Sequence, residues 1–66
     1  MVSTLFSNVS SKFGTWINQQ VGRTQGREVV QGSWLALLKA EQQGKLRSIE
    51  HAEKLLYVVG RRLIAN

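Results

Sequence analysis

Residues 2–21 have the sequence VSTLFSNVSSKFGTWINQQV and carry one charged side chain, that of Lys12. When this stretch is placed on a helical wheel, with about 100° between successive residues, its large apolar side chains occupy less than half of the circumference. Small polar residues, chiefly serine, threonine and asparagine, occupy the rest. We therefore expect an amphipathic helix over residues 3–21. Its apolar side chains are Val2, Leu5, Phe6, Val9, Phe13, Trp16, Ile17 and Val21.

Glycine marks the expected ends of the helices, because the chain has six glycines and no proline. Residues 22–26, GRTQG, contain two glycines and a threonine that can cap a helix, which is typical of a break between helices. A second helix is expected over residues 27–43, with an apolar stripe wide enough to contact two neighbours. Gly44 is placed to end this helix in a left-handed conformation. Glu41 lies inside the stripe near the end of the helix, where it can pair with Arg47 or Lys45 or extend to solvent.

The third expected helix, residues 48–64, has the most regular pattern. Its apolar residues follow one another at spacings of three and four, from Ile49 to Leu63. Ser48 can cap the helix by accepting hydrogen bonds from its first free amides. Glutamates lie near its N-terminal end and arginines near its C-terminal end, as the helix dipole favours. Periodicity and local electrostatics therefore indicate the same helix.

Short connections between three helices predict an all-α fold, a small three-helix bundle that occupies residues 1–66 as one domain. The bundle is expected to run up-down-up, and a helix-turn-helix-like arrangement of the last two helices is the main alternative. A chain of 66 residues encloses a small core, and without cysteine it has neither a disulfide nor a thiolate metal site to support that core. Helix packing has to supply the stability, and a homo-oligomer would add buried surface.

Positive charge is the clearest indication of a partner. Nine lysines and arginines against four acidic residues give a formal net charge of +5. Such an excess favours nucleic acid, anionic lipid or an acidic protein surface as a partner, and the alternative is that it only keeps the protein soluble. An up-down-up bundle brings the end of the first helix, the start of the second and the end of the third to one pole. There we expect Arg23, Arg27, Arg61 and Arg62 to bind phosphate or carboxylate groups.

Each guanidinium offers a planar fork of donors that suits an oxyanion. Lys54, on the side of the third helix, completes the candidate anion-binding set. The alternative is that arginines near helix ends only complement the helix dipole. No helix face has the uninterrupted display of base-reading side chains that a sequence-specific reader needs, since Glu50 lies beside Lys54. We therefore expect contact with nucleic acid that does not depend on base sequence.

A second role is binding to protein alone, as an adaptor, an inhibitor or a homodimer. Leu35 and Tyr57 are expected to project away from the core, and with Lys39 they form a candidate partner surface. A third role is binding at a membrane interface through Phe6, Phe13 and Trp16. The preferred interpretation is that these three aromatic side chains form the core, because the other two helices need a cover.

The sequence argues against catalysis, a cofactor, a metal ion and a small-molecule substrate. It has no cysteine nucleophile, and His51 is the only histidine. The glycine-containing stretch GRTQGR lacks the GxxxxGK[ST] pattern of a phosphate-binding loop. No apolar run approaches the roughly 20 residues of a membrane-spanning helix, and no motif carries a resemblance to a known family. We expect a cytoplasmic, non-enzymatic regulator or accessory factor.

Overall fold

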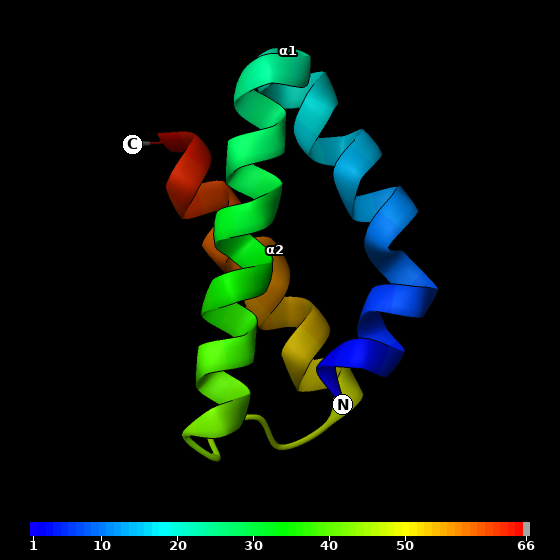
Figure 1. Cartoon of the computed structure of the whole chain (residues 1–66), viewed down its shortest axis with the longest axis vertical. Helices are drawn as coiled ribbons and strands as arrows, with labels where there is room; N and C mark the ends of the chain where they lie inside the picture. Colours follow the sequence, from blue (N-terminus) through cyan, green and yellow to red (C-terminus); the bar gives the residue numbers. More distant parts are fainter. Residues whose placement is uncertain (66) are drawn as a thin grey trace.

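The structure, a computed structural model that describes residues 1–65, consists of two helices, α1 over Val2–Gln42 and α2 over Ile49–Ala65 (Figure 1). Helix α1 is sharply bent, because Gly22 leaves the helical conformation with φ 85° and ψ 172°. The ribbon turns back on itself where its colour passes from cyan to green (Figure 1). We call residues 2–21 the first arm and residues 23–42 the second arm of α1.

This architecture corrects the expected fold. The all-α class is confirmed, but the three-helix bundle is wrong, and so is its helix-turn-helix-like variant. The chain forms a helical hairpin of α1 and α2, and α1 is interrupted by a kink at Gly22. Residues 22–26 are not a connecting loop, since Gly22 alone departs from helical geometry. A single glycine can reverse the chain because it has no Cβ to exclude positive φ.

Gly26, which the sequence placed in that loop, lies within the second arm of α1 instead. It is buried inside the second arm, and a Cβ built on it would collide with the side chain of Asn18 in the first arm. The two arms thus approach each other closely one turn after the bend. Gly26 is therefore a packing residue within the helix, and its absence of a side chain permits the tight reversal at Gly22.

The connection between the two helices follows the sequence prediction. Gly44 has a φ of 71°, and the backbone N–H groups of Gly44 and Lys45 donate to carbonyls in the last turn of α1 at 3.0 and 2.9 Å. This pair of bonds is the Schellman arrangement. The backbone N–H of His51 donates to the Ser48 hydroxyl at 3.1 Å, so Ser48 caps α2. The expected end of one helix and start of the next are both confirmed.

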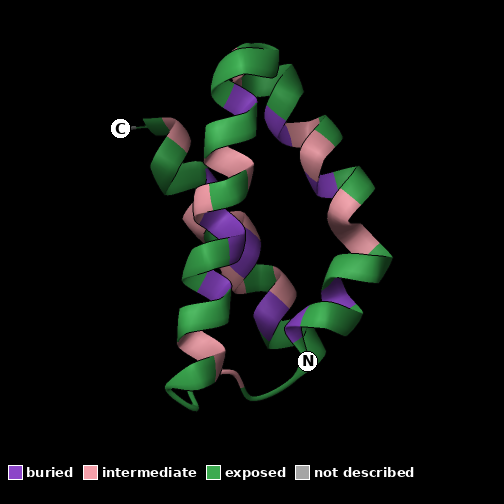
Figure 2. Ribbon diagram, viewed as in Figure 1, coloured by how far each residue is buried: buried purple, intermediate pink, exposed green. Residues whose placement is uncertain are grey.

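The core lies where the two arms of α1 meet α2 (Figure 2). Phe13 is fully buried, and its ring centroid lies 6.0 Å from that of Trp34 in the second arm and 5.2 Å from that of Tyr57 in α2. Gly60 lets α2 approach, because a Cβ there would lie 2.9 Å from the tip of the Phe13 ring. The buried apolar residues are Val2, Leu5, Phe13, Ile17, Trp34, Leu37, Ala52 and Leu56.

A polar contact joins the two ends of α1. The carboxylate of Glu41 lies 3.1 Å from the amino group of Met1 and accepts a hydrogen bond from the backbone N–H of Val2 at 3.2 Å. These two donors, the amino group first, lower the pKa of Glu41. Glu41 therefore pairs with neither Arg47 nor Lys45 and does not simply extend to solvent, because the bend in α1 brings the start of the first arm to this carboxylate.

Replacing Gly22 tests the bend. Gly22→Ala places a Cβ at a φ of +85°, where L residues are strained, so we expect it to lower the free energy of unfolding by about 1–3 kcal/mol. Gly14→Ala is the matched control, since a Cβ at Gly14 meets nothing within 4 Å inside a helix. It should raise stability by about 0.5–1 kcal/mol. Urea unfolding followed by circular dichroism measures both, and equal effects would contradict the bend.

Candidate functional site

All nine lysine and arginine side chains are exposed to solvent. Over residues 1–65, none of them forms an ion pair with a glutamate, and the salt bridge found there joins Glu41 to the amino group of Met1. The surface therefore presents a widely distributed positive charge that is available to a partner in solution.

The four arginines that the sequence assigned to one pole lie toward the same end of the molecule. Arg23 and Arg27 follow the bend directly, and α2 ends on the side of the molecule where α1 turns back (Figure 1). They are not drawn into one cavity, because Arg61 and Arg62 line a cleft that Arg23 and Arg27 do not reach. Lys54 is exposed on α2, as expected. The anion-binding role of these residues stays a prediction.

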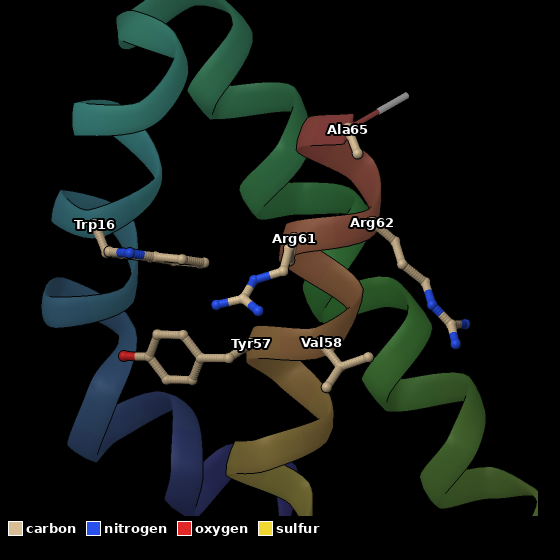
Figure 3. Close-up of a pocket in the computed structure, with 6 residues that line it drawn as sticks. All are labelled: Trp16, Tyr57, Val58, Arg61, Arg62 and Ala65. Carbon is tan, nitrogen blue, oxygen red and sulfur yellow. The ribbon is translucent and has the colours of Figure 1, made fainter.

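An open cleft of about 450 Å³ lies between the first arm and α2 (Figure 3). The rings of Trp16 and Tyr57 form one wall, with their centroids 5.1 Å apart and their planes tilted by 59°. The guanidinium of Arg61 extends toward these two rings, whereas Arg62 points toward the other side of α2 (Figure 3). We call this feature the Trp16–Arg61 cleft. Its lining residues are Trp16, Tyr57, Val58, Arg61, Arg62 and Ala65.

Tyr57 departs from its expected position. The sequence placed it away from the core, but it is half-buried and packs edge-on against Phe13, with 84° between the ring planes. Burial raises the pKa of the Tyr57 phenol above its usual value, and the carboxylate of Glu53 raises it further. The prediction failed because α2 packs against α1 through Ala52, Leu56 and Gly60. Ile49 and Leu63, at the ends of the predicted stripe, are exposed instead.

A second exposed feature lies on α1 alone. Phe6 is 51% exposed, Leu35 65% and Leu38 42%, and we call these three residues the apolar face. Two shallow grooves, of about 380 and 410 Å³, share Phe6, Trp34 and Leu38. Leu35 and Lys39 are exposed, as the predicted partner surface required. These apolar side chains are exposed to solvent, and no other segment within residues 1–65 packs over them.

The aromatic residues of the first arm divide between these features and the core. Phe13 is fully buried, Trp16 is half-buried at the cleft, and Phe6 is largely exposed on the apolar face. The preferred interpretation, that all three form the core, therefore holds for Phe13, in part for Trp16, and is wrong for Phe6. The sequence did not indicate the cleft, because helical periodicity assigns faces within a segment but does not show which faces meet.

Neither a metal site nor a membrane-spanning helix is found over residues 1–65. Over residues 1–65 no group of three or more His, Asp or Glu side chains is arranged to hold a metal ion. None of the helices in that range has the length and apolar character needed to cross a membrane. Comparisons of the chain with protein families, with curated proteins and with solved structures find no match.

Tyr57 can be titrated alone, because it is the only tyrosine. Its raised pKa means that the neutral phenol is favoured in the folded protein, so folding gains stability below the usual tyrosine pKa of about 10. That stability is lost as the pH rises through the higher, folded value. Ultraviolet absorbance of the phenolate should show a higher midpoint in the folded protein than in urea. Equal midpoints would contradict the packing of Tyr57.

Proposed function

We propose that the protein is a small, non-enzymatic accessory factor that binds nucleic acid through its exposed basic side chains. The observation that carries this proposal is that nine exposed lysines and arginines lack a glutamate partner within residues 1–65, on a chain of net charge +5. Binding to phosphates releases condensed counterions, which favours association without any base-specific contact. The same charge raises the rate of encounter with a polyanion.

The spread of the charge favours nucleic acid over an acidic protein. Arg23 and Arg27 follow the bend in α1, whereas Lys45 and Arg47 lie in the connection between the two helices. Lysines along the helix sides lie between these ends, and Lys54 is one of them. A nucleic acid carries phosphates at regular intervals and so can contact several of these groups at once. An acidic protein patch would match a compact cluster of cations better than this distribution.

Salt dependence tests the proposal. We expect a labelled oligonucleotide to bind at about 50 mM salt and to lose affinity as salt rises, with a log-log slope of about −0.9 per phosphate contact on duplex DNA. The double variant Arg23→Gln/Arg27→Gln should bind more weakly and with a shallower slope, because two potential phosphate contacts are removed. Fluorescence anisotropy measures both quantities. The proposal fails if the wild-type chain binds no oligonucleotide at the lowest salt.

Self-association through the apolar face is a second candidate function. A second copy of the chain is the favoured occupant, because the residues that line the two grooves include no charged side chain. In a two-fold dimer, like surfaces meet, and an uncharged surface can do so without repulsion. Phe6 lines both grooves and is 51% exposed, so each copy offers an exposed aromatic ring within a shallow recess. Burial of these side chains would supply hydrophobic stabilisation to a chain with a small core.

Light scattering over a range of concentrations tests this candidate. We expect a dimer, and we expect Leu35→Glu to return it to a monomer because the variant places a charge in the interface. Val58→Glu is the matched control, since Val58 is 46% exposed on α2 and should leave the dimer intact. Circular dichroism checks that both variants keep the wild-type helix content. A wild-type chain that stays monomeric at every concentration removes the candidate.

A further inference from the structure

We infer that the Trp16–Arg61 cleft binds an unpaired nucleobase together with its adjoining phosphate, so that the protein prefers single-stranded to duplex nucleic acid. This inference rests on the proposed function and adds the form of nucleic acid and the place where it is recognised. It concerns one cleft, whereas the general attraction involves basic side chains at both ends of the molecule and along the sides of the helices.

The aromatic wall of the cleft supplies a surface for stacking. Trp16 is half-buried, and its position is fixed by contact with two rings, since its centroid lies 6.0 Å from Phe13 and 5.1 Å from Tyr57. The part of the indole that remains exposed borders the cleft. Bases stack on such rings whatever their identity, because every base has a π face. A ring already held in place loses little conformational freedom when a base stacks on it.

The charge at the cleft suits a phosphate. Arg61 extends toward the aromatic rings (Figure 3), and its guanidinium can pair with a phosphate oxygen in a bidentate manner. Arg62 also lines the cleft, but its guanidinium points toward the other side of α2 (Figure 3), so Arg61 supplies the positive charge that faces the aromatic rings. Over residues 1–65 no carboxylate lines this cleft, whereas Glu28 lines a neighbouring groove beside the end of α2. Glu53, which raises the pKa of the Tyr57 phenol, lies outside the lining. A phosphate paired with Arg61 would therefore meet a positive charge inside the cleft and the negative charge of Glu53 outside it.

No other groove described over residues 1–65 combines these elements. The groove beside Glu28 has no aromatic lining residue, and the grooves of the apolar face have no basic one. The Trp16–Arg61 cleft also opens to solvent, so a continuous strand can lay one nucleotide into it and continue on either side. Single-stranded binding proteins combine a positively charged groove with aromatic stacking platforms in this way.

The same chemistry disfavours duplex. In double-stranded DNA the bases are stacked on one another, so none offers a face to Trp16 unless it is first turned out of the helix. That step requires base pairs and stacks to be broken. Duplex can therefore contact only the basic side chains, while a single strand gains the stacking contact as well. The difference in affinity between single strand and duplex therefore measures what the cleft contributes to binding.

The experiment compares oligo(dT) of about ten nucleotides with a duplex of the same length at the same salt concentration. Anisotropy should give at least roughly fivefold tighter binding of the single strand, which corresponds to the lower end of base–aromatic stacking. Tryptophan fluorescence should be quenched by oligo(dT) but not by duplex, because Trp16 is at the cleft and Trp34 is only 7% exposed. Equal affinity for both forms with unchanged fluorescence would overturn the inference and leave the proposed function standing.

Two pairs of variants assign the preference to the cleft. Arg61→Gln should weaken oligo(dT) binding more than duplex binding, whereas Lys45→Gln, which removes a charge from the connection between helices, should weaken both alike. Trp16→Leu should abolish the single-strand preference, while Ile49→Ala, which shortens an exposed apolar side chain outside the cleft, should keep it. Arg61 is exposed, so we expect Arg61→Gln to fold and to test the cleft even if Trp16→Leu unfolds. Equal losses for Arg61→Gln and Lys45→Gln would overturn the assignment, and failure of both oligonucleotides to bind would end both proposals.

Discussion

The ring of Phe13 contacts all three helical segments of the protein. It lies in the first arm of α1, packs edge-on against Trp34 of the second arm and against Tyr57 of α2, and is fully buried. Aromatic pairs of this kind contribute about 0.5–1.5 kcal/mol each beyond the burial of area. Two glycines make the contacts possible, since Gly22 reverses the chain and Gly60 leaves room for the ring.

The candidate sites are extensions of this aromatic cluster. Phe13 holds Trp16 and Tyr57 at one edge of the core, where they form the wall of the Trp16–Arg61 cleft. Trp34 holds Phe6 at another edge, where its exposed ring forms part of the apolar face, with the two centroids 5.0 Å apart. The side chains that stabilise the fold thus also position the surfaces that would bind partners. A substitution in this cluster changes both the fold and the candidate sites, so each variant needs a measurement of stability as well as of affinity.

The features that the sequence predicted correctly depend on contacts between residues that are close in the chain. The periodicity of α2, its serine cap and the glycine that ends α1 all follow from contacts within a few residues. The errors concern contacts between distant segments. Gly22 and Gly26 gave the same signal of a break, although one reverses the chain and the other packs against Asn18. The contact of Tyr57 with Phe13 and the pairing of Glu41 with the amino group of Met1 depend on the bend, which periodicity does not describe.

The contacts of Phe13 underlie both the fold and the position of the cleft, so nuclear Overhauser spectroscopy of the protein in solution tests the account most directly. Ring protons of Phe13 should give cross-peaks to protons of Trp34, Tyr57 and Gly60, which lie on the second arm and on α2. Cross-peaks from Phe13 that reach only its neighbours within the first arm would contradict the account, because the first arm would then extend away from the rest of the protein.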